Sequence, residues 1–197
     1  METIRTFIAV ELPADVREAL GKAEAMLQTA DPGAARSVKW VAPASIHLTL
    51  KFLGDTPVAT LEAIRAALEQ AVAGKHHLSL HLGKAGCFPN ARQPRVLWIG
   101  VEGETDGLAR LQAAVETTVS PLGFPTESRG FSPHLTLGRV RDDASPDARQ
   151  RLGAAIQSLR PPLVSFMATG VSLMRSDLRP SGAVYTQLAE AELSRQQ

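Results

Sequence analysis

Charge of one sign, cysteine and long apolar runs are all scarce in this sequence. Lysine and arginine total 21 against 20 aspartate and glutamate residues, a net charge of +1, which excludes a broad surface that tracks long nucleic acid and leaves room only for a small basic pocket. Cys87 is the only cysteine, so no intrachain disulfide can form, and a reducing compartment is favoured. No apolar stretch approaches the length of a membrane span or the core of a signal peptide. We therefore expect a cytoplasmic protein with no membrane partner.

The apolar content is sufficient for a core of ordinary size. Hydrophobic residues make up 44% of the 197 positions, which is enough to bury one core, and no low-complexity tract or long linker divides the chain. The sequence therefore predicts one domain over residues 1–197, with room for two lobes.

One tetrapeptide occurs twice. His47-Leu48-Thr49-Leu50 recurs as His134-Leu135-Thr136-Leu137, a separation of 134 − 47 = 87 residues, which suggests two similar halves. Each copy lies in a run typical of a β-strand, where residues i and i+2 share a face. The histidine and threonine of each copy therefore project together, and the leucines pack behind them. A lone histidine in a strand is usually structural, but the repetition favours a catalytic pair.

The remaining pattern alternates short strands with amphipathic helices. Many strand pairs are joined by loops too short for a parallel crossover, so we expect mostly antiparallel sheets with helices on their outer faces, an α+β fold. Thr56 and Pro57 fit the N-cap and first residue of the second helix. Helices are predicted at about 14–30, 57–73, 104–119 and 146–159, and strands at about 3–12, 37–41, 46–53, 77–82, 95–101, 132–140, 163–168, 171–175 and 183–188.

Three further histidines cluster in sequence and present a metal-site alternative. His77 and His81 share one face of an alternating strand, and His76 precedes them. No cysteine, aspartate or glutamate lies nearby in sequence to complete a ligand set, so a solvated strand face is the better interpretation. We expect neither a bound metal nor a cofactor.

With these motifs and flanks the chain resembles the 2H phosphoesterase superfamily. Within it, the similarity is to the RNA 2′,3′-cyclic phosphodiesterases, also called bacterial 2′-5′ RNA ligases. The resemblance covers nearly the whole chain. It implies a bilobal fold with pseudo-two-fold symmetry, in which each lobe brings one motif strand to a central cleft. The stretches that carry it are RTFIAVELP, WVAPASIHLTLKFLGD, RVLWIGV, FSPHLTLGRV and SLMRSDLRPSGAVYTQL.

The residue types suit hydrolysis of a cyclic phosphodiester. In-line attack by water needs a general base and a general acid on opposite sides of phosphorus, and imidazole populates both protonation states near neutrality. Thr49 and Thr136 are placed to donate hydrogen bonds to phosphoryl oxygens. By resemblance, His47 donates the proton to the leaving oxygen and His134 accepts one from water. The products would be RNA ends with a 2′-phosphate, and the reverse reaction would form a 2′-5′ linkage.

Further substrate contacts are predicted around the motifs. By resemblance, Arg139 contacts phosphate, although strict alternation would place it on the opposite face unless Gly138 allows a bulge. Lys51 and Ser132 share parity with the motif histidines and are candidates to line the cleft.

Three aromatic side chains are candidates to stack on a nucleobase. Core packing is the better interpretation for Phe7 and Trp40, whereas Phe131 is undecided and is carried as a substrate-binding candidate.

The expected partner is an RNA with a 2′,3′-cyclic phosphate end, tRNA fragments being candidates, or a small cyclic nucleotide. DNA is excluded because it lacks the 2′-hydroxyl. A monomer is expected. The alternatives are a phosphodiesterase for small cyclic nucleotides or 2′-5′ oligonucleotides, a non-catalytic module that binds RNA ends, and a metal-dependent hydrolase that uses the histidine cluster.

Overall fold

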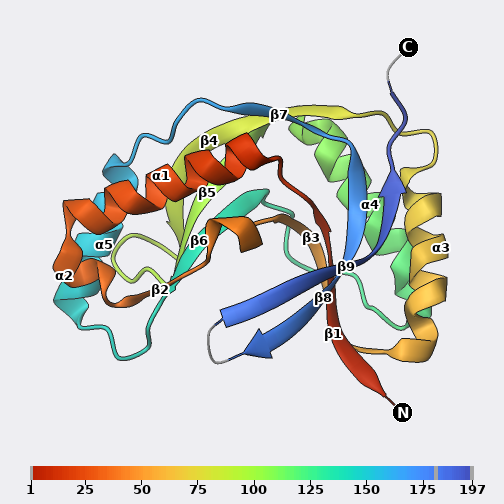
Figure 1. The fold of residues 1–197 in the computed structure, drawn as a ribbon, viewed down its shortest axis with the longest axis horizontal. Helices are drawn as coiled ribbons and strands as arrows, with labels where there is room; N and C mark the ends of the chain where they lie inside the picture. The colour runs from red at the N-terminus through yellow and green to blue at the C-terminus, as the bar shows by residue number, and fades with distance from the viewer. Residues whose placement is uncertain (1, 180–181, 196–197) are drawn as a thin grey trace.

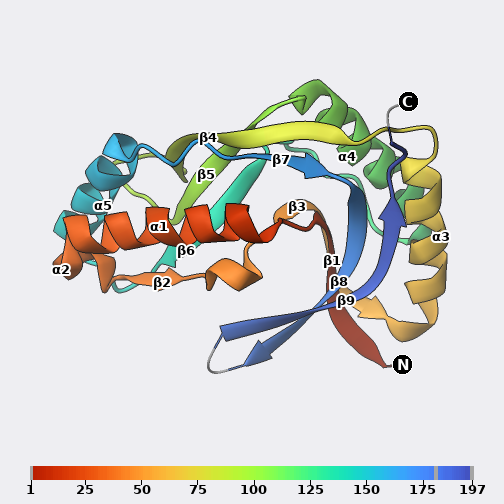
Figure 2. The ribbon, with the colours of Figure 1, turned by 45° about the horizontal axis from the view of Figure 1, so that its top comes forward.

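Two antiparallel sheets organise the computed structural model, which describes residues 2–179 and 182–195. Sheet A has the strand order β3-β1-β8-β9 and sheet B the order β2-β6-β5-β4-β7, and every recorded strand pair is antiparallel, as predicted (Figures 1 and 2). The strands are β1 (Thr3–Val10), β2 (Val38–Trp40), β3 (Leu48–Pro57), β4 (Leu78–Phe88), β5 (Val96–Gly103), β6 (His134–Val140), β7 (Ser165–Ala168), β8 (Gly170–Arg179) and β9 (Gly182–Glu192).

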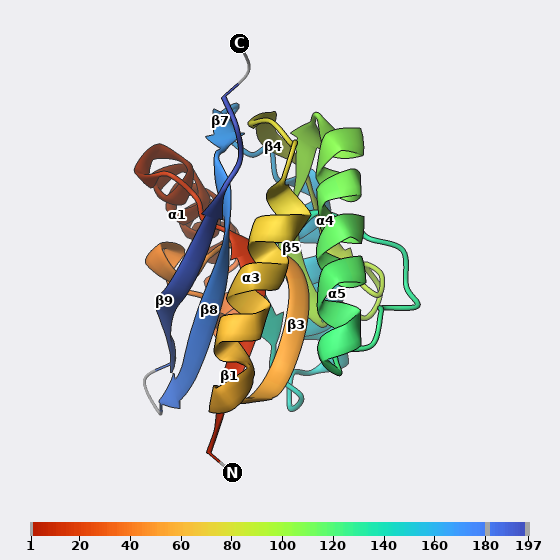
Figure 3. The same cartoon turned by 90° about the vertical axis from the view of Figure 1, so that its right-hand side faces the viewer.

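The helices cover the sheets in two groups. Helices α3 and α4 lie side by side over sheet A, α1 crosses sheet B, and α5 packs against β4 (Figures 1 and 3). Their spacing of apolar residues places one buried stripe on the sheet, for example Ile64, Leu68 and Val72 of α3. None of the helices in the described ranges is both long and apolar enough to cross a membrane. The helices are α1 (Ala14–Ala30), α2 (Pro32–Ala35), α3 (Leu61–Val72), α4 (Thr105–Val119) and α5 (Pro146–Ser158).

The two sheets repeat one another strand by strand. The run β3-β1-β8-β9 matches the run β6-β5-β4-β7, with β2 added beyond β6. The motif strand of each run has a β-bulge at the same place: Leu50 is the extra residue in β3 and Leu137 the extra residue in β6. A shared strand order and a shared bulge support the predicted pseudo-two-fold relation between the lobes.

Several element boundaries differ from the prediction, and three of the differences bear on the site. Helix α3 begins at Leu61 rather than Pro57, because β3 continues through Pro57 and the buried Thr56 hydroxyl hydrogen-bonds Thr6 at 2.6 Å instead of capping a helix. Strand β4 continues to Phe88, well past the predicted end at 82. Strand β6 begins at His134 rather than 132, because Pro133 has no N–H to donate to a neighbouring strand.

Candidate active site

The two motif histidines are oriented by the same type of hydrogen bond, from Nδ1 to the backbone carbonyl oxygen two residues earlier. His47 Nδ1 lies 3.0 Å from the Ser45 carbonyl oxygen, and His134 Nδ1 lies 2.7 Å from the Ser132 carbonyl oxygen. Because a carbonyl oxygen only accepts, Nδ1 carries the hydrogen in both rings. Nε2 is therefore the nitrogen of each imidazole that is free to exchange a proton with a substrate.

The paired bulges decide which side chains join the histidines. An extra residue reverses the alternation of a strand, so the residue two places beyond it returns to the motif face. In β6 this brings Arg139 to the face of His134. The sequence predicted that Arg139 would reach this face only if the strand had a bulge near Gly138, and the bulge is present at Leu137. In β3 it buries Lys51 on the reverse face, where the residue is 3% exposed, and turns Phe52 outward at 60% exposed. The prediction that Lys51 shares the face of His47 is therefore wrong.

Lys51 belongs instead to a buried polar network behind the site. Its ammonium lies 2.5 Å from a Glu116 carboxylate oxygen and donates to the Pro125 carbonyl oxygen at 2.7 Å. The same carboxylate accepts from Gln112 at 3.1 Å and from the Glu127 amide at 3.3 Å. The network joins β3 to α4 and to the segment that leads into β6.

The structure gives the other predicted substrate contacts mainly structural surroundings. Ser132 precedes β6, and its recorded contribution to the site is the carbonyl oxygen that orients His134. Phe131 is half-buried against the main core. Trp40 also packs against that core, as expected, and its indole donates to the Ala35 carbonyl oxygen at 3.2 Å.

His47 is enclosed by aromatic rings. Phe7, which is 3% exposed, stacks on the imidazole at 4.4 Å and 23° between planes, and Tyr185 meets it edge-on at 4.9 Å and 89°. Burial lowers the pKa of His47 to about 4; the Ser45 hydrogen bond opposes this shift and the charge of Arg17 adds to it. His47 is therefore neutral in the free protein near pH 7.

His134 has more open surroundings. Phe88 meets its ring edge-on at 5.1 Å and 84°, and Trp98 is tilted at 6.3 Å, but no aromatic ring among the described residues stacks on its face. Sequence reasoning missed Tyr185 and Phe52. Tyr185 could have been suspected as the only tyrosine in the chain, whereas Phe52 depends on a bulge that strand alternation cannot show.

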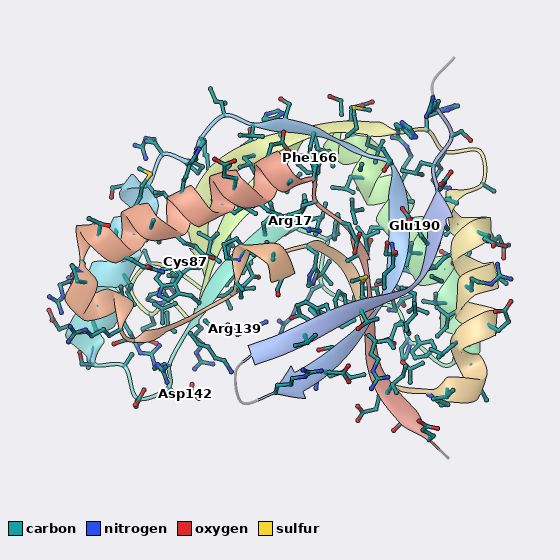
Figure 4. All side chains as sticks on the ribbon, in the orientation of Figure 1. Arg17, Cys87, Arg139, Asp142, Phe166 and Glu190 are labelled. Atoms are coloured by element: carbon teal, nitrogen blue, oxygen red, sulfur yellow. The ribbon has the colours of Figure 1, made fainter. Side chains whose placement is uncertain are left out.

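Contacts between the sheets bring the two motif strands together. Strand β3 touches β6 directly where the sheets meet. The charge of Arg139, from sheet B, acts on the pKa of the Tyr185 hydroxyl, and the Tyr185 ring contacts His47 of sheet A. The Arg139 side chain is labelled in Figure 4. Arg139 of sheet B and His47 of sheet A therefore both act on or contact Tyr185.

The motif threonines keep their hydroxyls available. Thr49 and Thr136 are half-buried beside their histidines, and within residues 2–179 and 182–195 neither hydroxyl makes a hydrogen bond. Each can therefore donate to an oxygen of a bound group without breaking a contact first.

The metal-site alternative finds no support in the geometry. Across the described part of the chain, no group of three or more histidine, cysteine, aspartate or glutamate side chains could hold a metal ion. His81 lies 3.7 Å from Glu102 on the neighbouring strand, which is the arrangement of an exposed cross-strand pair.

Comparison with known proteins identifies the family. Residues 10–180 match the model of the 2′-5′ RNA ligase superfamily. The chain belongs to this superfamily. Relatives in it include the RNA 2′,3′-cyclic phosphodiesterases of Methanothermobacter thermautotrophicus, 34% identical over 94% of this chain and 96% of the relative, and of Thermotoga maritima, 31% identical over 96% and 95%.

Solved structures that are similar to this chain have the same fold. A crystal structure of a Thermus thermophilus protein superposes with a TM-score of 0.79 at 31% identity, over 98% of this chain and all of the other. The E. coli protein LigT in complex with 3′-AMP superposes with a TM-score of 0.74 at 26% identity, again over 98% and 100%. The predicted family and its α+β fold of two antiparallel sheets are thereby confirmed.

Proposed function

We propose that this protein hydrolyses the 2′,3′-cyclic phosphate end of RNA to a 2′-phosphomonoester. The observation that carries the proposal is the pair of His-Thr motifs on adjoining strands, each imidazole anchored through Nδ1 so that Nε2 is free. Relatives about 30% identical over most of the chain bear the name RNA 2′,3′-cyclic phosphodiesterase, which supports the same assignment.

In the proposed mechanism the phosphorus lies between the two imidazoles. His134 accepts a proton from the attacking water, and His47 donates one to the departing 3′-oxygen. Because His47 is neutral in the free protein, it must gain its proton as substrate binds; an adjacent phosphate anion favours imidazolium and raises its pKa. Two imidazoles supply both proton transfers, so the mechanism requires no metal ion.

The neighbouring side chains contact the rest of the substrate. Thr49 and Thr136 donate to the non-bridging oxygens, where negative charge grows in the transition state. Arg139 adds a guanidinium to the same phosphate. Phe52, exposed on the His47 face, offers its ring to a nucleobase.

An RNA end is favoured over other substrates on chemical grounds. Only a ribose can form the cyclic ester, which excludes DNA. LigT has been crystallised with 3′-AMP and with phosphate, ligands that match the nucleotide and phosphate parts of the proposed substrate. Reverse ligation through a 2′-5′ bond, action as a monomer and a cytoplasmic location stay predictions.

End-group analysis tests the proposal. A short RNA with a 2′,3′-cyclic phosphate is incubated with the protein in excess EDTA, and the phosphate of the product is located. We expect a 2′-phosphate at the rate seen without EDTA. A 3′-phosphate product, no turnover, or turnover only after a metal ion is added would refute it. Parallel reactions with a 2′,3′-cyclic mononucleotide and a 2′-5′ dinucleotide rank the alternative substrates.

A further inference from the structure

Tyr185 contacts the site from a strand that carries neither motif. It lies on β9, paired with Ser176 of β8, in the last hairpin of sheet A. Its ring meets Phe7 edge-on at 5.1 Å and 82° and meets His47 edge-on at 4.9 Å. Phe7 in turn stacks on the imidazole face at 4.4 Å. The His47 ring therefore has one aromatic ring on its face and a second standing perpendicular to it.

The single hydrogen bond to Ser45 leaves part of the orientation of His47 undetermined. The outer torsion of a histidine side chain is broad, and one hydrogen bond at Nδ1 does not fix the ring plane. Two aromatic contacts at right angles do restrict it, because edge-on and stacked arrangements each have a preferred geometry. His134 lacks the stacked contact among the described residues, so this restriction is particular to one of the two histidines.

The recorded contact of Tyr185 with His47 is an edge-on contact between the two rings. Within the described ranges the hydroxyl makes no hydrogen bond. Burial raises the pKa of the phenol, and the charges of Arg139 and Arg5 partly offset this, so the side chain is neutral near pH 7. The charged group that acts on His47 itself is Arg17, from α1.

We propose that Tyr185 is a positioning residue of the phosphodiesterase site, whose ring and that of Phe7 clamp the His47 imidazole with Nε2 directed at the substrate. This inference rests on the proposed function for its kinetic consequence only, since the clamp itself exists in the free protein. By excluding water from the ring, the clamp also keeps His47 unprotonated until an anion arrives.

Two substitutions separate the ring from the hydroxyl. Tyr185→Phe keeps the ring, and we expect a kcat within about threefold of wild type. Tyr185→Leu removes it, and we expect kcat to fall by about 10- to 100-fold with KM little changed, as for a misplaced catalytic group. The His47 pKa, read from its imidazole proton NMR signals in the free protein, should stay near 4 in Tyr185→Phe and move toward 6.5 in Tyr185→Leu.

Val184→Ala controls for damage to the hairpin, because Val184 is the exposed neighbour of Tyr185 on the same strand. Thermal unfolding should be alike in Val184→Ala and Tyr185→Leu if the hairpin is intact. The proposal is overturned if Tyr185→Leu leaves both the His47 pKa and kcat unchanged, or if Tyr185→Phe loses as much activity as Tyr185→Leu. The NMR titration needs no substrate, so it tests the clamp even if the end-group experiment fails.

Discussion

The two motif strands begin alike and then diverge. His47 immediately precedes β3 and His134 begins β6, and in both strands the threonine and the bulge follow at the same spacing. The next two residues are Lys51 and Phe52 in one strand and Gly138 and Arg139 in the other. Sheet A therefore places an aromatic ring on the motif face where sheet B places a guanidinium. In the mechanism that we propose, the repeated backbone geometry supplies the two proton-transfer groups, and the unlike residues beyond the bulges contact different parts of an asymmetric substrate.

Removing either imidazole should have the largest effect. We expect His47→Ala and His134→Ala each to lower kcat by about 10³- to 10⁴-fold, because each removes one proton transfer. His81→Ala is the matched control, a strand histidine paired with Glu102, and should retain wild-type activity. Hydrolysis of a cyclic-phosphate RNA under saturating conditions measures the three rates. Loss of less than tenfold in either motif variant would refute equivalent catalytic roles.

Substitution of Lys51 tests the buried ion pair that follows the bulge of β3. Lys51→Met leaves Glu116 buried without its cation, and we expect the free energy of unfolding to fall by about 3–5 kcal/mol. The double variant Lys51→Met/Glu116→Met should recover most of this loss, because it removes the unpaired charge. Urea denaturation provides both values. A single variant as stable as wild type would show that the ion pair does not hold β3 in place.

Phe52 and Arg139 should separate base recognition from phosphate recognition. We expect Phe52→Ala to lower kcat/KM by about 10-fold for nucleoside 2′,3′-cyclic phosphates, with no change for a ribose 2′,3′-cyclic phosphate that lacks a base. Arg139→Ala should weaken the binding of both substrates to the same extent and reduce the dependence of KM on salt concentration. Equal losses on both substrates for Phe52→Ala would exclude stacking.

A second buried glutamate gives the smallest expected effect. Glu24 of α1 is 6% exposed, its Oε1 has no hydrogen-bond partner in the described part of the chain, and burial raises its pKa to about 8. The unfolded chain releases this proton near pH 4.5 and the folded protein only near 8, so stability falls as pH rises between those values. Glu24→Gln should therefore unfold at a higher temperature than wild type at pH 8 and not at pH 4.5. Equal melting curves at pH 8 would show that the carboxyl is not buried in solution.

Strand alternation predicted the side-chain faces correctly before the bulges and wrongly for Lys51, which lies beyond one of them. His47, Thr49, His134 and Thr136 lie before the bulges, so their shared faces followed from spacing alone. Lys51 lies immediately after one, and the reversal sent it to the core.

Contacts between residues far apart in the sequence could not be predicted from it either. The sequence from Gly182 to Glu192 does not predict the contact between Tyr185 and His47, which lies about 140 positions earlier. That contact depends on the order of strands in sheet A. The predicted helix start at Thr56–Pro57 was wrong for a related reason. The Thr56 hydroxyl hydrogen-bonds Thr6 of β1, a residue far away in sequence, and does not cap a helix.

Phosphate binding followed by NMR tests most directly whether both histidines serve one phosphate. Inorganic phosphate is titrated into the free protein while the imidazole signals of His47 and His134 are monitored, with His81 as internal reference. We predict that both motif signals shift with one common dissociation constant and saturate together, and that the pKa of His47 rises well above 4 in the complex. Shifts in only one of the two signals, or two unequal constants, would contradict the account.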